Sequence, residues 1–290
     1  MFTEKKHGLI TYFTSPILDF YGIPHFFAAR RGGVSAGDFE SLNVSPARKD
    51  SRGFTDSPEN IYENYRRALE IIDVSPQNAC TTKQVHSDIV KTVCESDAGA
   101  GVMPRHQVCD DCDGLVVERG TKNVGAVCVK TADCVPILLA NVKTGAVAAV
   151  HAGWRGTVGD IVTRAVEKLG ANPCDIAAAI GPCIGKCCYE VGNEVYLAAK
   201  RLFEAKGISE DRLDAAFSSR AACSADTVKY ADLALINKLL LESGGVCESN
   251  IDLSGLCTCC TKDALGELVF FSHRAMGGHS GTFVSAIKTF

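Results

Sequence analysis

The sequence lacks the features typical of membrane, nucleic-acid-binding and secreted proteins. No apolar stretch approaches the roughly 18 residues that a membrane-spanning helix needs. The net charge is −4, and no run of lysine or arginine offers the basic surface that nucleic-acid binding requires. No long apolar core follows the charged residues 4–7, so we expect no secretory signal peptide. We therefore expect a cytoplasmic protein that binds neither nucleic acid nor membrane.

Cysteine, by contrast, is abundant. The chain has 15 cysteines among 290 residues, with 46% hydrophobic and 22% charged residues, as in an ordinary globular enzyme. In a chain of this length without a signal peptide, reduced thiols are favoured over a disulfide framework. Cys80, Cys94, Cys128 and Cys174 lie among apolar or small neighbours, so we expect them to fill the core.

The hydrophobic pattern predicts strands in the middle of the chain with helices on both sides. A loop rich in glycine, serine and charge covers residues 30–56. Helices are predicted at residues 57–72, 160–169, 191–205 and 230–241. Strands are predicted at residues 124–129, 135–142, 146–151, 176–180, 268–272 and 284–287. This order predicts one α+β layered domain, residues 1–290, without strict βαβ alternation.

Three segments hold residues with metal-binding chemistry. His86, Cys134 and His151 each lie where an apolar run gives way to small or polar residues. Two imidazoles and one thiolate form a zinc site with one position open to water or substrate, as in catalytic zinc centres. The wide spacing argues against a zinc finger, whose ligands come in close pairs. Taken singly, a histidine or one of fifteen cysteines is more often structural, so only the combination indicates a metal centre.

The segment after His151 has the composition of an anion-binding turn. Gly153 and Gly156 allow the backbone to approach a ligand closely. Arg155, Thr157 and the start of the following helix could receive a phosphate. An ordinary tight strand-to-helix turn explains the same residues equally well.

Several unbroken motifs together resemble the YfiH/FAMIN family. The resemblance runs from about residue 26 to the C-terminus. The motifs are Gly32-Gly33-Val34-Ser35, Ser41-Leu42-Asn43, Gln84-Val85-His86, Asp113-Gly114-Leu115-Val116, Thr131-Ala132-Asp133-Cys134-Val135-Pro136-Ile137, His151-Ala152-Gly153-Trp154-Arg155-Gly156, Ile180-Gly181-Pro182-Cys183-Ile184, Cys257-Thr258 and Phe270-Phe271-Ser272-His273-Arg274.

The resemblance implies a fold, an activity and a ligand set. Family members are described as purine nucleoside phosphorylases with adenosine deaminase activity, formerly named polyphenol oxidases or laccase-domain proteins. Their fold is an α/β/β/α sandwich with mixed sheets. The zinc ligands of the family correspond to His86, Cys134 and His151, so these residues are expected to bind zinc and to be catalytic. Purine nucleosides and phosphate are the expected partners.

The resemblance also indicates substrate-binding residues. Asn43, Arg155 and Arg274 lie in matching motifs and are expected to contact nucleoside or phosphate. The family usually carries two further arginines near the C-terminus, where this chain has Ala275 and Thr282. Arg274 is therefore the only one of the three family arginines that this chain keeps. Residues 270–274 are interpreted as an apolar strand with the cationic Arg274 side chain at its end.

Two other activities remain open at this point. A multicopper laccase needs many imidazoles, whereas the chain has seven histidines and no His-X-His pair. Copper at the same three ligands, acting in polyphenol oxidation, is still possible, since copper binds such sites at least as tightly as zinc. A cysteine hydrolase, with Cys134 as nucleophile and His151 or His86 as base, uses the same residue types. A non-catalytic binding role is the weakest interpretation.

A second metal site is a further hypothesis. Cys109 and Cys112 have the C-x-x-C spacing of zinc ligands. Cys187-Cys188, or the segment Cys257-Thr258-Cys259-Cys260, would complete the set. The acidic, loop-like character of residues 109–112 argues against it.

Overall fold

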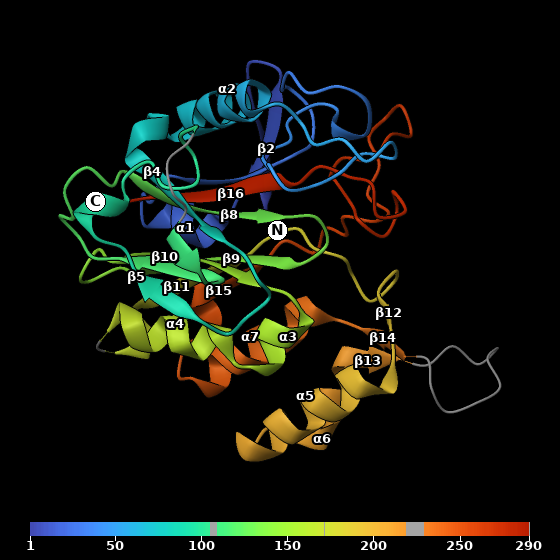
Figure 1. Cartoon of the computed structure of the whole chain (residues 1–290). Coiled ribbons are helices and arrows are strands. Elements are labelled where there is room, and N and C mark those ends of the chain that lie inside the picture. Colours follow the sequence, from blue (N-terminus) through green and yellow to red (C-terminus); the bar gives the residue numbers. More distant parts are fainter. Residues whose placement is uncertain (105–108, 171, 219–228, 290) are drawn as a thin grey trace.

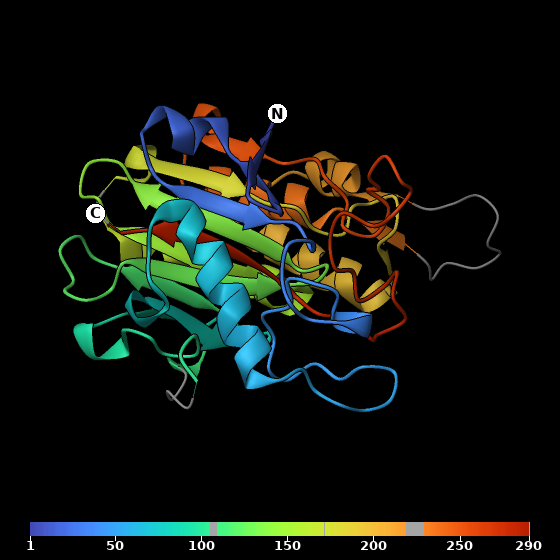
Figure 2. The same cartoon turned by 90° about the horizontal axis from the view of Figure 1, so that it is seen from above.

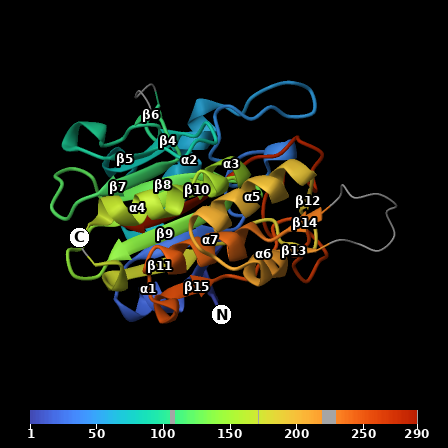
Figure 3. The same cartoon turned by 90° about the horizontal axis from the view of Figure 1, so that it is seen from below.

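Two large mixed β-sheets stack face to face, and helices cover both outer faces (Figure 1). The computed structural model describes residues 1–104, 109–170, 172–218 and 229–289. Figure 2 views the molecule from the side of α2 (Pro58–Leu69), and Figure 3 from the opposite side. The described helices include none that is both long and apolar enough to cross a membrane.

The first large sheet joins strands from distant parts of the chain. In spatial order, its described strands are β1 (Thr3–His7), β2 (Ile10–Thr14), β3 (His25–Ala28), β16 (Phe283–Lys288), β8 (Ala126–Thr131), β4 (Ala79–Lys83) and β6 (Cys109–Asp111). β4 runs parallel to β8 and β6, and the other neighbouring pairs are antiparallel. The predicted helix start is confirmed, because the Ser57 side chain caps α2 by accepting a hydrogen bond from the Asn60 amide. α2 packs Ile61, Tyr65 and Leu69 on this sheet.

The second large sheet carries more helices. Its described strands are, in order, β15 (Ile251–Leu253), β11 (Ile176–Ile180), β9 (Val135–Asn141), β10 (Val147–Ala152), β7 (Gly114–Val117) and β5 (Val90–Thr92). The helices on this side are α3 (Trp154–Val158), α4 (Ile161–Leu169), α5 (Asn193–Ala205), α6 (Glu210–Ala216) and α7 (Leu233–Ser243). A small sheet of β12 (Glu190–Val191), β14 (Lys229–Ala231) and β13 (Phe217–Ser218) lies beside them, and α1 (Pro16–Phe20) contacts β11 and β15.

Three apolar clusters correspond to the three interfaces between layers. The first cluster packs α2 against the outer face of the first sheet, and the second cluster lies between the two sheets. The third cluster packs α4 and α7 against the second sheet. Phe27, Leu138 and Phe270 are fully buried in the central cluster. This confirms the expected α/β/β/α sandwich with mixed sheets.

Most predicted elements in the middle of the chain are confirmed, with ends shifted by a few residues. The hairpin between β9 and β10 is present, and the Asn141 side chain accepts hydrogen bonds from the amides of Lys143 and Thr144. The helices predicted from residues 191 and 230 begin later, at Asn193 and Leu233, because short strands precede them.

The strand predicted at residues 268–272 is wrong. Phe270 and Phe271 are fully buried between the sheets, but the segment is irregular and makes only a single bridge, from Leu268 to Lys262. Its apolar run therefore reflects burial of two rings, and no strand ladder is involved. The cationic end at Arg274 belongs to a loop for the same reason.

The cysteine prediction is half right. Cys80 and Cys128 are buried in the first sheet. Cys94 and Cys174 are exposed instead, Cys94 beside Asp97 and Cys174 with its sulfur 2.9 Å from that of Cys247. Both begin or lie in short 3₁₀ turns at the surface, where small neighbouring residues do not indicate burial.

His25 makes the fold sensitive to mild acid. It is 2% exposed in β3; its Nδ1–H donates to the Ile23 carbonyl (2.8 Å) and its Nε2 accepts from the Ser15 amide (2.7 Å). Burial lowers the pKa of His25 below its ordinary value of 6.5. A protonated Nε2 could not accept the Ser15 hydrogen bond, so the folded state favours the neutral ring.

We therefore expect the free energy of unfolding to fall as the pH drops below 6.5, by at most about 1.4 kcal/mol per pH unit for this one group. Stability from His25 is complete above pH 6.5 and is lost toward the lower folded pKa. Urea unfolding between pH 7 and 5 should show a smaller pH slope in His25→Gln, and an unchanged slope in the exposed control His7→Gln. Equal slopes in His25→Gln and the parent protein would refute this role.

Candidate metal centre and its pocket

The structure brings His86, Cys134 and His151 together at one point. His86 lies in the loop between β4 and β5, Cys134 immediately precedes β9, and His151 lies near the end of β10. Their ligand atoms all lie within 4.8 Å of one another, and Cys134 Sγ is 3.9 Å from His86 Nε2. The two imidazole rings meet edge to face with centroids 4.9 Å apart. Two nitrogen donors and one sulfur donor thus converge, and this donor set fits zinc with an open position.

Asp113, just before β7, positions two of these three residues. It is fully buried, and its carboxylate accepts a hydrogen bond from His151 Nδ1 at 2.7 Å. The same carboxylate accepts from the amides of Val85 (3.2 Å), His86 (3.1 Å) and Ser87 (2.6 Å), and from Ser87 Oγ (2.7 Å). It holds the His86 backbone in its left-handed conformation, φ 61°. A carboxylate behind a ligating imidazole fixes its tautomer and orientation.

The electrostatics of the site favour a thiolate. Burial alone raises the pKa of Cys134, but the facing His151 and then His86 lower it to about 6. Burial lowers the pKa of His151, but the Cys134 thiolate and Asp113 raise it to about 9. Burial raises the pKa of Asp113 as well, yet His151 and Ser87 bring it down to about 2. The thiol is therefore held in the form that binds metal or attacks an electrophile.

Gln84 and Gly153 belong to the motifs that contain His86 and His151, and each has a structural role beside the candidate ligands. The Gln84 amide bonds the Lys130 backbone twice, accepting from N at 2.8 Å and donating to O at 2.7 Å. It thereby continues the β4–β8 pairing and directs the chain to His86. A Cβ on Gly153 would lie 3.0 Å from the His86 ring and 3.3 Å from Cys134 Sγ, so a side chain there would crowd both of these residues.

Asp133 holds the backbone just before Cys134. It adopts φ 92°, and its carboxylate accepts from Thr258 Oγ1 (2.6 Å) and from the Arg274 amide (2.7 Å). Its carbonyl accepts from the Ile184 amide at 2.9 Å. Three loops that are distant in sequence therefore meet behind the thiolate.

A cavity of about 310 Å³ opens beside the three ligands. Its size is that of a small-molecule site. Cations and hydroxyl groups line it together with the ligands. The lining residues are Ser45, Pro46, Ala47, Arg48, Thr82, Lys83, Gln84, His86, Gly101, Lys130, Thr131, Ala132, Cys134, His151 and Thr282.

The three expected substrate-binding residues, Asn43, Arg155 and Arg274, do not belong to the described lining of this cavity. Asn43 is fully buried, and its side chain bonds Asp56, Ser45 and the Thr282 amide. It therefore positions two residues that do line the cavity. Arg155 stacks on Trp154 with the guanidinium 4.4 Å from the ring centroid.

The loop that leads into β12 holds the Arg274 side chain. Its guanidinium donates to the carbonyls of Cys188 (3.3 Å) and Glu190 (3.1 Å), and it lies 5.7 Å from the Tyr189 ring centroid. These contacts tie Arg274 to β12 and its preceding loop.

Sequence reasoning missed Asp113, Arg48 and Lys130 as functional candidates. Asp113 stands in a quoted motif, and a carboxylate directly before a fully apolar strand was the available signal. Arg48 lies in the polar loop 30–56, and Lys130 lies within a strand, so neither position carries a pattern in the sequence.

The hypothesis of a second site at Cys109 and Cys112 needs correction. Cys112 is fully buried in the apolar cluster between the sheets and belongs to neither of the described candidate metal groups. The side chain of Cys109 lies outside the described part of the structure. The structure instead brings the two proposed completing segments to each other, as Cys187, Cys188, Cys257 and Cys260.

The layered fold and the two-histidine, one-cysteine centre define an α/β protein with a candidate mononuclear metal site. Residues 24–289 match the family model "Multi-copper polyphenol oxidoreductase laccase", and the chain belongs to this family, which includes the YfiH proteins.

Similar proteins cover nearly the whole chain. A "Purine nucleoside phosphorylase" of Bacteroides thetaiotaomicron is 31% identical over 91% of both chains. "Purine nucleoside phosphorylase YlmD" of Geobacillus stearothermophilus is 32% identical over 99% of this chain and 96% of that protein. The crystal structure of YlmD from the same organism superposes with a TM-score of 0.82 at 29% identity, covering 99% and 98% of the chains. A Bacillus licheniformis YfiH structure gives a TM-score of 0.82 at 26% identity and covers 98% of each chain.

Proposed function

We propose that this protein is a zinc-dependent purine nucleoside phosphorylase that also deaminates adenosine. One observation carries the proposal: His86, Cys134 and His151 face a cavity whose other polar lining consists of cationic and hydroxyl side chains and the Gln84 amide. Such a lining suits a substrate pair made of an anion and a hydroxyl-rich sugar. The names of the relatives, purine nucleoside phosphorylase, agree with that chemistry.

The metal role follows from the donor set. His86, Cys134 and His151 would hold zinc, which supplies Lewis-acid activation of a water or of the substrate. Asp113 keeps the His151 ring oriented with Nδ1–H toward the carboxylate, so Nε2 faces the centre. Gly153 has no side chain, so the space next to the His86 ring and the Cys134 sulfur stays open.

The phosphate side of the reaction depends on the cavity's cations. Lys83 lies 3.0 Å from the Asp111 carboxylate, so its charge is partly compensated. Arg48 instead contacts the Nδ1 of His273 at 3.0 Å, and burial with the adjacent Arg48 charge lowers the pKa of His273. Lys130 Nζ donates to Thr81 Oγ1 and to the Thr82 carbonyl, whereas Arg48 faces a neutral ring and takes part in none of the described ion pairs. We assign it to the phosphate.

In phosphorolysis, a phosphate oxygen attacks C1′ of the ribose and the bond from C1′ to the purine nitrogen breaks. The electron pair of that bond leaves with the purine, which takes up a proton. Adenosine and phosphate thus give adenine and ribose 1-phosphate. In deamination, adenosine and water give inosine and ammonia. In this proposal Asn43, Arg155 and Arg274 have supporting roles through the contacts described above.

The test combines metal analysis with product analysis. The purified protein should contain zinc and should convert inosine and phosphate to hypoxanthine and ribose 1-phosphate. Adenosine should give inosine in the absence of phosphate. A metal-free protein that is fully active on another substrate, in a thiol-dependent way, would overturn the proposal and support the cysteine hydrolase. The lowered pKa of Cys134, set by its neighbours His151 and His86, is the observation that keeps this second candidate open.

Copper-dependent polyphenol oxidation has less support. The described candidate metal groups contain two histidines between them, both in the centre with Cys134. Such a set can bind a single copper ion but cannot build the clusters of a multicopper enzyme. Oxygen consumption with a phenol as substrate, measured beside the nucleoside assays, decides between the two chemistries.

Arg48→Ala should raise the KM for phosphate by about 10- to 100-fold, the value of a charge-assisted hydrogen bond to a phosphate oxygen. Deamination of adenosine, which uses no phosphate, should change little. Arg274→Ala is the matched control, because that arginine holds a loop through two carbonyls. A larger rise in the KM for phosphate in Arg274→Ala than in Arg48→Ala would reverse the two assignments.

No disulfide joins the cysteines whose side chains the structure describes. This supports the proposal that the protein works in a reducing compartment such as the cytoplasm. We further propose that residues 1–290 act as one catalytic domain.

A further inference from the structure

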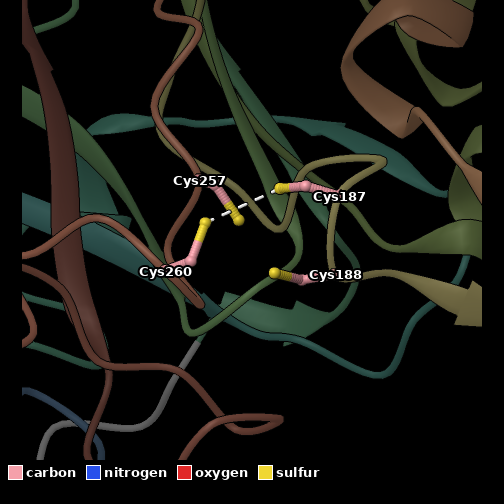
Figure 4. Close-up of side chains that lie close together, drawn as sticks. All are labelled: Cys187, Cys188, Cys257 and Cys260. Carbon is pink, nitrogen blue, oxygen red and sulfur yellow. Dashed lines mark hydrogen bonds between the residues drawn. The ribbon is translucent and has the colours of Figure 1, made fainter.

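Four cysteine sulfur atoms converge at a second point of the molecule (Figure 4). Cys187 and Cys188 come from the loop between β11 and β12, and Cys257 and Cys260 from the loop after β15. All four sulfurs lie within 4.8 Å of one another, and those of Cys187 and Cys260 are 3.6 Å apart. These residues are separate from His86, Cys134 and His151.

The backbone around Cys257 has the form of a metal-binding turn. The Gly185 amide donates to Cys257 Sγ at 3.2 Å. The amides of Cys260 (3.4 Å) and Thr261 (2.9 Å) both donate to the Cys257 carbonyl. The C-x-x-C segment therefore forms a tight turn at Cys257, and the Gly185 amide directed at the Cys257 sulfur stabilises a thiolate.

The two loops are already joined by main-chain pairing. Cys183 and Cys257 form a parallel bridge, in which the Cys183 amide donates to Leu256 O (3.2 Å) and the Thr258 amide to Cys183 O (2.9 Å). The backbone pairing of the two loops therefore brings the four sulfur atoms together and fixes the position of the loops that carry them.

The sulfur separations match a single tetrahedral ion. A zinc–sulfur distance of about 2.3 Å places tetrahedral sulfurs about 3.8 Å apart, close to the 3.6 Å between Cys187 and Cys260. A disulfide would need a sulfur–sulfur distance of about 2.05 Å. Four soft thiolates select zinc over the hard cations, and four protein ligands leave no open position for a substrate.

We propose that Cys187, Cys188, Cys257 and Cys260 bind a structural zinc ion, distinct from the zinc of the catalytic centre. The ion joins the loop after β11 to the loop after β15. Arg274 donates to the Cys188 carbonyl at 3.3 Å and places a positive charge beside the negatively charged four-thiolate complex.

The second zinc supports the first through one short chain of contacts. Thr258, next to Cys257, donates to the Asp133 carboxylate at 2.6 Å, and Asp133 precedes Cys134. Loss of the structural zinc would loosen the Thr258 loop and so weaken zinc binding at the catalytic centre, while leaving its three ligands in place. The metal-binding proposal itself does not depend on the substrate of the catalytic centre.

Metal counting on the full-length protein, purified under reducing conditions, tests the site. We expect two zinc ions per chain in the parent protein. Cys260→Ser and Cys187→Ser, both at exposed positions, should each retain one, and Cys134→Ala should retain the structural one. Cys94→Ser controls for loss of an exposed thiol, and Cys259→Ser for a change within the same loop but outside the ligand set; both should keep two.

Cobalt substitution gives a readout independent of activity and of metal loss during purification. Cobalt in the parent protein should show strong sulfur-to-metal charge-transfer absorption from four thiolates, which persists in Cys134→Ala and collapses in Cys260→Ser. One zinc per chain in the reduced parent protein, unchanged in Cys260→Ser, would overturn the proposal. A disulfide between Cys187 and Cys260 found by mass spectrometry in that reduced protein would also overturn it, and loss of the second zinc in Cys259→Ser would overturn the ligand set.

Discussion

Cys134→Ala should lose the zinc of the catalytic centre and all measurable nucleoside chemistry while remaining folded. Cys134 is the single sulfur among the three proposed ligands, and the pair of imidazoles left behind does not hold zinc tightly. Removing a residue that merely orients a ligand costs about 10- to 100-fold in metal affinity, so removing a ligand should cost more. The residue immediately precedes β9 and borders the cavity, so its loss leaves the apolar layers intact.

Calorimetric zinc titration and a thermal melt of the same sample check this result. Cys128→Ala is the matched control, since Cys128 lies fully buried in β8 and burial raises the pKa of its thiol to about 12. The control should retain zinc and activity and lose about 1 kcal/mol of stability from the lost packing. Full zinc occupancy of the catalytic centre in Cys134→Ala would exclude Cys134 as a ligand.

Asp113→Asn should weaken both the metal centre and the fold. The carboxylate accepts from three consecutive amides, a hydroxyl and an imidazole, all in a fully buried position. An amide at the same place turns an NH₂ group toward donors and leaves at least one buried N–H without an acceptor, at about 1–3 kcal/mol for each such group. We expect a loss of about 2–4 kcal/mol in the free energy of unfolding and a 10- to 100-fold loss of zinc affinity.

Urea unfolding and zinc competition with a chelator measure the two effects separately. Ser87→Ala removes a hydroxyl donor from the same carboxylate and leaves the His151 contact in place. It should lower stability by about 1 kcal/mol and keep zinc affinity nearly unchanged. If Asp113→Asn binds zinc as tightly as the parent protein, the carboxylate does not orient the ligand.

The sequence predicted the three residues that converge at the candidate metal centre better than the residues that position them. His86, Cys134 and His151 carry distinctive chemistry in distinctive motifs, so residue type and resemblance were enough to select them. Asp113 looks like any aspartate before a strand, and only the folded structure shows its buried carboxylate meeting five donors. Arg48 joins the cavity through a long loop, whose path no hydrophobic periodicity predicts.

Local sequence does not show which segments meet in the folded structure, and this also explains the errors in the predicted fold. The strands β8 to β11 are short apolar runs bounded by turns or by a predicted helix, so they were predicted nearly in place. β1 is mostly exposed and carries charged residues, so the sequence gives no sign of it. Phe270 and Phe271 have the apolar character of a strand, but they fill a space between two sheets whose existence local sequence cannot reveal. The four-cysteine cluster failed to be predicted for this reason too, because the correct partners lie about 70 residues apart in the chain.

The position of β16 governs how this protein acquires its first sheet. β16 lies between β3 and β8 and pairs with both, as Ser285 does with Phe27 on one side and Val129 on the other. β3 and β8 do not pair with each other, so β1 to β3 join the rest of the sheet through β16. The β3–β16 contact joins residues more than 250 positions apart, and such long-range pairing slows folding. Until it forms, the facing edges of β3 and β8 stay open, and a nascent or unfolded chain exposes them to pairing with other chains.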